Sequence, residues 1–120
     1  MKEFGACRRV VVDMAMIAHA QKMLASKSVQ LEKQARLFAL LGNEVRLRIV
    51  VLLLYKERLC VCDLADILKM RQPPVSQHLR KLKDAGVLVN RRKGMTVYYR
   101  IANDYKQILQ RCIGEDDASF

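Results

Sequence analysis

The chain has 120 residues, of which 52% are apolar, so it is long enough for one domain with a modest hydrophobic core. Lysine and arginine outnumber aspartate and glutamate by 22 to 12, which gives a formal net charge of +10 at pH 7. This balance favours an anionic partner, either nucleic acid or a membrane surface. No segment reaches the ~18 consecutive apolar residues of a membrane span, which argues against a membrane protein.

Residues 10–18 superficially suggest a signal peptide, because they are mostly apolar and follow two arginines. Asp13 interrupts the apolar run, and Lys22 and Lys27 follow closely. We therefore expect a cytosolic helix here.

The four cysteines are scattered, and two of them are separated by a single residue: Cys7, Cys60, Cys62 and Cys112. This spacing is a poor framework for disulfide bonds. Reduced thiols fit it better, so we expect a cytoplasmic protein.

The first predicted helix covers residues 13–25 and is apolar on most of its faces. Such a helix needs burial on more than one side. A second subunit is the expected cover, so residues 1–27 are predicted to form an N-terminal arm and dimerisation helix.

Two further helices are predicted before residue 56. Ser28 can cap the first of them, and Gly42 ends it. Asn43 then caps a helix whose residues 49–55 are apolar all round, which predicts a buried central helix.

A short helix is predicted to open at Cys62 or Asp63. Its stripe toward the core consists of Leu64, Ile67 and Leu68. The helix cannot run past Arg71, because the residue before a proline is pushed out of helical geometry and Gln72 precedes Pro73.

A second helix is predicted from Pro73 or Pro74 to Ala85, because the first helical turn needs no N–H from proline. Gly86 stops it. Two helices joined by a tight turn in under thirty residues form a helix-turn-helix, assigned to residues 60–86.

Residues 87–92 and 95–101 are β-rich and flank a turn at Lys93-Gly94, which predicts a hairpin, or wing, over residues 87–101. A last helix, residues 103–113, is predicted to begin at Asn103 or Asp104. The expected fold class is therefore α+β, mainly α: one winged helix-turn-helix domain, residues 1–120, with extra N- and C-terminal dimerisation helices.

The helix after the tight turn is predicted to read DNA. On a helical wheel its core stripe is Val75, Leu79 and Leu82, whereas donors and acceptors suited to base edges point away. Residues 71–93 include seven basic residues and only one acidic residue, Asp84. The wing's cations suit phosphates or a minor groove. The expected DNA-binding residues are Gln72, Ser76, Gln77, His78, Arg80, Lys81, Arg91, Arg92 and Lys93, with His78 open to either a phosphate contact or packing.

The sequence resembles the ArsR/SmtB-type (arsenic repressor) family of bacterial metal-sensing winged-helix regulators. The resemblance covers about residues 29–113 and is carried by Leu40 through Ile49, Leu59 through Leu64, Val75 through Leu79, Leu82, Ala85 through Leu88 and Gly94 through Ile101. It implies a homodimer, joined through the first and last helices, that represses a metal-resistance operon. It also implies release from operator DNA when a metal or metalloid binds.

In this family the Cys-Val-Cys-Asp-Leu motif supplies thiolates to soft ions, which implies Cys60 and Cys62 as ligands here. Ala65 stands where arsenite-type members often carry a third cysteine. Cys7 is the expected third ligand for As(III) or Sb(III), and Cd(II), Pb(II) or Hg(II) remains an alternative. The rival third ligand, Cys112, continues a stripe of Tyr105, Ile108 and Leu109, so core packing is expected for it.

Residues two apart in a regular helix do not face each other. Two thiolates that close on one ion must therefore sit at an extended helix start, or distort it. We expect ion binding to reshape the entrance of the short helix and so to move the reader helix.

Two other functions on the same scaffold stay open: a thiol redox or sulfide sensor, and a constitutive DNA-binding module with inert cysteines. An enzyme is not expected. The sequence has no phosphate loop, and its two histidines, His19 and His78, lie on helices without an evident nucleophile. No organic cofactor is expected.

Overall fold

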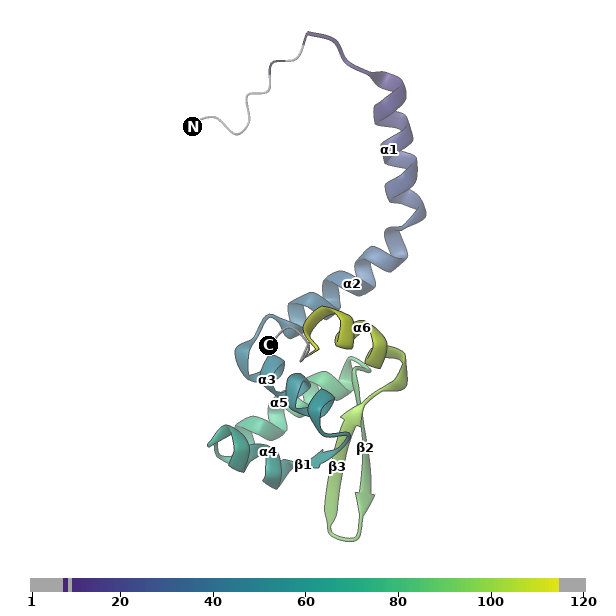
Figure 1. Cartoon of the computed structure of the whole chain (residues 1–120). Coiled ribbons are helices and arrows are strands. Elements are labelled where there is room, and N and C mark those ends of the chain that lie inside the picture. Colours follow the sequence, from purple (N-terminus) through teal and green to yellow (C-terminus); the bar gives the residue numbers. More distant parts are fainter. Residues whose placement is uncertain (1–7, 9, 115–120) are drawn as a thin grey trace. The chain divides into compact units, whose positions relative to one another are not determined.

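The computed structural model describes residue 8 and residues 10–114 (Figure 1). Within these residues it contains helices and a small sheet, in the mainly α mixture that the sequence predicts. The elements are α1 (Met14–Ser26), α2 (Ser28–Leu41), α3 (Glu44–Tyr55), β1 (Leu59–Cys60), α4 (Val61–Leu68), α5 (Gln72–Asp84), β2 (Leu88–Lys93), β3 (Thr96–Ile101) and α6 (Asn103–Ile113).

The chain divides into two compact units, Met1–Ala35 and Arg36–Phe120. The first contains α1, whose start is capped as Asp13 accepts a hydrogen bond from the N–H of Met16 at 2.9 Å. None of the residues of α1 is buried. Ser28 is the first residue of α2 rather than its cap, because the carbonyl of Lys27 already accepts the N–H of Leu31.

The hydrophobic core lies in the second unit, where α3, α4, α5 and the sheet pack together. The predicted stripe of α5 is confirmed, since all three of its members are 0% exposed: Val75, Leu79 and Leu82. Burial of α3 is one-sided, because Ile49 and Val50 are buried whereas Tyr55 is 75% exposed. The expected cap of α3 is present, as the Asn43 side chain accepts the N–H of Arg46 at 3.0 Å.

The helix-turn-helix forms with shifted boundaries. Helix α4 begins at Val61, one residue earlier than expected, because Cys60 takes the cap position with an extended backbone. Helix α5 begins at Gln72 rather than at a proline, with Arg71 as its extended cap. The prediction that Gln72 lies outside the helix is wrong. Both prolines sit in the first turn, where N–H groups have no helical partner and none is lost.

The predicted inner stripe of α4 is only partly correct. Leu64 and Ala65 are buried, whereas Ile67 is 50% exposed. Residues turn by about 100° each along a helix, so a face centred between Leu64, Ala65 and Leu68 leaves Ile67 more than about 100° away. Ala65, which stands where arsenite-type members often carry a third cysteine, packs inward instead of Ile67.

The turn between α4 and α5 depends on one left-handed residue. Lys69 has φ 58° and ψ 45°, and Met70 then donates its N–H to the carbonyl of Ala65 at 2.9 Å. This closes the end of α4 and directs the chain into α5.

The three strands form an antiparallel sheet in the order β1-β3-β2. The wing is confirmed, but its loop is Gly94-Met95, because Lys93 pairs with Thr96. Gly94 has φ +65°, which glycine adopts without a steric penalty. Strand β1 was not predicted. Its two residues pair with Tyr99 and Tyr98 of the wing and are too few to show a period of two.

Helix α6 starts at Asn103, with Ala102 as its cap. Leu109 is buried and Tyr105 and Ile113 pack against the core, so the inner stripe runs at intervals of four residues. Ile108 and Cys112 fall beside this stripe and are exposed. The expected core packing of Cys112 is therefore wrong within this chain.

A pair of substitutions in α4 tests this packing. Leu64→Ala should lower the free energy of unfolding by about 2–5 kcal/mol, because it leaves a cavity in the core. Ile67→Ala removes a similar side chain from a half-exposed position and should cost about 1 kcal/mol or less. Urea denaturation followed by circular dichroism measures both. Equal losses for the two variants would contradict the observed orientation of α4.

Candidate nucleic-acid interface and thiol site

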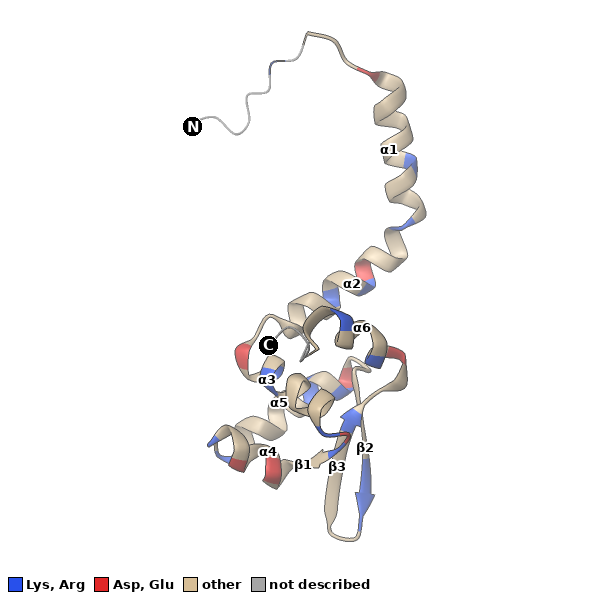
Figure 2. Cartoon of the chain, in the orientation of Figure 1, with Lys and Arg blue, Asp and Glu red and all other residues tan. Residues whose placement is uncertain are grey.

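One face of α5 is polar, basic and exposed. Gln77, Arg80 and Lys81 are exposed, and Ser76 is half-buried beside them. They occupy the side opposite the buried stripe, as the helical wheel predicts. Lysine and arginine also run along β2 (Figure 2).

The cations of the wing project from both faces of the hairpin. Arg91, Arg92 and Lys93 are consecutive in β2 and exposed. Because side chains alternate along a strand, Arg91 and Lys93 share one face and Arg92 takes the other. The wing therefore presents positive charge on either side of its tip.

His78 lies at the edge of the reader face and contacts α3. Its Nδ1 is 3.2 Å from Nη1 of Arg46, whose Nε donates to the carbonyl of Leu40 at 2.7 Å. A guanidinium carries only donors, so Nδ1 must accept and the ring is neutral, with its proton on Nε2. Burial, then the charges of Arg46 and Lys81, lower the pKa of His78 below its ordinary value of 6.5.

Sequence reasoning missed the role of Arg46. The residue lies 32 positions before His78, and the sequence indicated only that it lies near the solvent-exposed start of its helix. The predicted cap at Asn43 was the available signal for this role. Asn43 caps the N–H of Arg46, and a capped first turn fixes the direction of the Arg46 side chain.

The two thiols of the Cys-Val-Cys motif lie where β1 becomes α4. Cys60 is 9% exposed, and Cys62 is exposed in the first turn of the helix. Burial raises the pKa of Cys60, with the charges of Asp63 and Cys62 adding to the effect and a backbone hydrogen bond at Asp63 opposing it. The expectation of an extended helix start is met, because Cys60 has φ −90° and ψ 167°.

Cys62 touches the reader helix directly. Its Sγ accepts a hydrogen bond from Nε2 of Gln72, the first residue of α5, at 3.4 Å. Gln72 was predicted as a DNA contact, and its side-chain amide is instead directed at the thiol site. This contact joins the start of α4 to the start of α5.

The candidate third ligands are not brought to this site by the part of the chain described. Cys7 lies outside the described residues, and Cys112 is exposed on α6. Among residues 8 and 10–114, no group of three histidine, cysteine or acidic side chains is arranged to hold a metal. The sulfur pair fits a soft ion in chemical type, and it needs at least one ligand from elsewhere.

Helix α5 has a buried apolar stripe and a polar outer face, and a basic hairpin, β2 and β3, follows it. Together these features define a winged helix-turn-helix DNA-binding domain. Residues 43–90 match the family described as "Bacterial regulatory protein, arsR family". A cadmium resistance regulatory protein CadC homolog of Staphylococcus aureus is 30% identical over 106 residues, covering 88% of this chain and 86% of that protein. The chain belongs to the ArsR family of bacterial regulatory proteins.

Two further similarities bear on function and assembly. The arsenic resistance transcriptional regulator ArsR1 of Pseudomonas putida is 41% identical over 70 residues, covering 58% of this chain and 55% of that protein, so the chain spans about half of its length. The homodimeric winged helix-turn-helix DNA-binding domain of Mb0332 from Mycobacterium bovis, a possible ArsR-family regulator, matches with a TM-score of 0.64 and 32% identity. That match covers 72% of this chain and 80% of the other.

The family to which the chain belongs is one of bacterial regulatory proteins, which agrees with the expectation that the chain is not an enzyme. Among the described residues, no helix is both long and apolar enough to cross a bilayer.

The contact between Arg46 and His78 predicts a pH dependence of stability. Because the folded state lowers the pKa of His78, the unfolded state binds more protons below pH 6.5. The contribution of the neutral ring to the free energy of unfolding is therefore complete above pH 6.5 and is lost as the pH falls. His78→Asn keeps an acceptor near Nδ1 but cannot titrate. The unfolding free energy of the wild type should fall relative to this variant between about pH 7.5 and about pH 5.

The matched control is His19→Asn, which removes a histidine from the exposed helix α1. Urea denaturation at each pH gives the comparison. A constant difference between wild type and His78→Asn across this range would rule out the neutral, hydrogen-bonded ring.

Proposed function

We propose that the protein represses a metal- or metalloid-resistance operon and leaves its operator when a soft ion binds Cys60 and Cys62. The observation that carries this proposal is the 3.4 Å hydrogen bond from Gln72 to the Cys62 sulfur, because it links the thiol pair to the reader helix. The names of the arsenic and cadmium regulators among its relatives support the choice of ion class.

The reader helix supplies the base contacts in this proposal. Arg80 and Lys81 suit guanine and Gln77 suits adenine, each bidentate pair contributing about 1–3 kcal/mol of discrimination. Ser76 can serve either base. Arg91, Arg92 and Lys93 contact phosphates, which positions the domain without reading sequence.

His78 contributes a phosphate contact through Nε2. Its Nδ1 is occupied by Arg46, so the remaining ring N–H is the free donor. The hydrogen bond from Arg46 of α3 fixes the orientation of the ring, so Nε2 can hold a phosphate in a defined position.

Ion binding acts through the start of α4. A thiolate that coordinates an ion turns its lone pairs toward that ion, so Cys62 no longer accepts the Gln72 amide in the same geometry. Cys60 must also leave its extended cap position or draw the first turn of α4 toward it. Either change moves the base of α5, and a complete switch requires about 5 kcal/mol of preference for the released state.

The proposed inducer is As(III) or Sb(III), held by Cys60, Cys62 and Cys7. A pyramidal ion needs three thiolates, and Cys7 supplies the third from the same chain or from its partner. Cd(II), Pb(II) and Hg(II) are the alternative inducers, because thiolates bind them as well. A thiol redox sensor is the less supported alternative, because among the described residues neither Cys60 nor Cys62 is joined to another cysteine.

The functional unit is proposed to be a homodimer joined through α1 and α6. The exposed apolar residues of α1 support this assignment, since Met16, Met23 and Leu24 are each about half exposed or more. A dimer places two reader helices about 34 Å apart, or a multiple of that, so that each enters the same side of the duplex.

Ion titrations test the thiol site. A labelled duplex selected by the protein from a random-sequence pool serves as operator, and fluorescence anisotropy follows release on addition of As(III), Cd(II), Hg(II) or Zn(II). The wild type should be released by a soft ion, whereas Cys60→Ser and Cys62→Ser should need at least about 10-fold more of it. Cys112→Ser is the matched control and should behave as wild type.

Release of Cys62→Ser at the wild-type ion concentration would contradict the site. Gln72→Ala separates binding from switching. It should bind the ion with unchanged affinity, measured by thiolate absorbance, while the ion weakens its DNA binding less than it weakens that of the wild type.

Assembly is tested by sedimentation equilibrium. Leu24→Glu places a charge on the exposed apolar surface of α1 and should raise the dimer dissociation constant by at least about 10-fold, because burying an unpaired charge is costly. Gln21→Glu adds the same charge to the same helix at a polar position and should have a smaller effect. A monomeric wild type, or equal effects of the two variants, would overturn the assignment of α1.

A further inference from the structure

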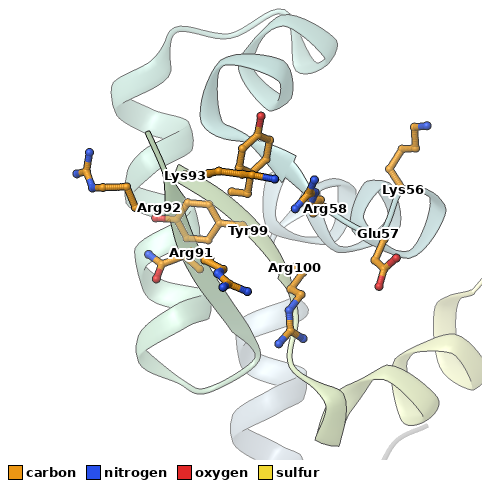
Figure 3. Close-up of a pocket in the computed structure, with 10 residues that line it drawn as sticks. Lys56, Glu57, Arg58, Arg91, Arg92, Lys93, Tyr99 and Arg100 are labelled. Carbon is orange, nitrogen blue, oxygen red and sulfur yellow. The ribbon is translucent and has the colours of Figure 1, made fainter. Parts of the chain in front are cut away.

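A basic pocket lies at the base of the wing, away from the reader helix. It has a volume of about 810 Å³ and is lined by the α3–β1 loop together with β2 and β3 (Figure 3). Six of its ten lining residues are lysine or arginine, and one is acidic. In Figure 3 the side chains of Arg58 and Lys93 extend into the same part of the pocket.

Strand register places the principal cations on one face of the sheet. Arg91 and Cys60 both pair with Tyr98, from opposite sides, and Arg100 lies two residues beyond Tyr98. Residues two apart share a face, so Lys93 and Arg100 accompany Arg91 and Tyr98. This face is the one opposite Leu88 and Ile101, which are buried in the core.

The positive charge of the pocket is not neutralised by its one carboxylate. Glu57 lies 3.9 Å from Nζ of Lys106, a residue outside the pocket. Among the described residues, no acidic side chain forms an ion pair with Lys56, Arg58 or Lys93, nor with the arginines of β2.

Two of the arginines are held in place. The guanidinium of Arg58 lies 5.0 Å from the centre of the Tyr98 ring, so it rests on an aromatic surface that keeps its N–H groups free. Nη1 of Arg100 donates to the carbonyl of Ile101 at 3.3 Å and lies 3.5 Å from the side chain of Asn103. Guanidinium groups that are fixed in this way and have no carboxylate partner among the described residues suit the oxygen atoms of phosphates.

We propose that this pocket binds phosphate groups of the DNA backbone, so that the protein grips the duplex with the base of the wing as well as with its tip. The proposal rests on the proposed function. It adds Lys56, Arg58 and Arg100 to the DNA-contacting residues. The contacts position the protein and carry no sequence information, because phosphates are the same at every base pair.

Continuity with the wing favours DNA over a free phosphate compound. Lys93 and Arg91 are separated by about 7 Å along β2, and the row continues across β3 to Arg58 over about a further 10 Å. A row of this length matches a string of phosphates better than a single small anion. The shared chemistry is the phosphate oxyanion, and the two sources are separated by experiment.

The salt dependence of DNA binding measures the number of phosphate contacts. For a labelled random-sequence duplex of about 30 base pairs, the slope of log K against log salt concentration changes by about 0.9 per phosphate. The double variant Lys56→Gln/Arg58→Gln should therefore have a slope smaller in magnitude by about 1.8 than that of the wild type. Arg36→Gln, which changes an exposed arginine on α2, is the control and should leave the slope nearly unchanged.

A charge gain supplies an independent test with no loss of fold. Glu57→Gln removes the only acidic residue of the pocket and should tighten binding to the same duplex. Glu32→Gln changes the net charge equally on α2 and should tighten it less. Circular dichroism and sedimentation of every variant establish that fold and assembly are retained.

A slope of the double variant equal to that of the wild type or of Arg36→Gln would overturn the proposal. A second outcome would also overturn it. Calorimetry would show that the wild type binds inorganic pyrophosphate and that the double variant does not, while the salt slope of DNA binding is the same for both proteins. The pocket would then bind a free anion rather than DNA. The proposed function is judged separately by Arg80→Ala, which should weaken binding to the selected operator more than to the random duplex. A wild type that binds neither duplex would overturn both.

Discussion

Burial of the stripe Val75, Leu79 and Leu82 fixes the orientation of the reader helix. All three side chains are fully buried, and α5 packs through them against α3, α4 and β2. A helix held on one side by close-packed aliphatic groups cannot rotate without opening cavities. The polar outer face is therefore presented at one angle, and any signal that moves it must act on the elements beneath.

The packing of α5 explains why the helix-turn-helix could be predicted from the sequence. Leu79 lies four residues after Val75, and Leu82 lies three residues after Leu79, which is the spacing of one face of a helix. Gly86 marks the end of the helix. The same reasoning failed for Ile67 and Cys112. Short helices leave too few apolar positions to define the centre of the buried face, so a neighbouring position was assigned to it.

The site was predictable in its residue types and less so in its connections. The motif around Cys60 and Cys62 indicates a thiol site, and the basic residues of α5 indicate a DNA-reading surface. The contacts of Arg46 with His78 and of Gln72 with Cys62 join residues 32 and 10 positions apart. Strand β1 is too short for any periodic signal. Such features follow from tertiary packing, which local sequence patterns do not encode.

Strand β1 gives the two cysteines different neighbours. Cys62 contacts the first residue of α5, whereas Cys60 pairs by its backbone with Tyr98, whose ring supports Arg58 at the base of the wing. Under the proposed function, one bound ion would thus act on two elements proposed to contact DNA by separate routes, one through a side-chain amide and one through a β ladder. By thermodynamic reciprocity, a duplex that clamps both elements weakens ion capture by the same factor, so operator-bound copies would be the last to sense the ion and free copies the first.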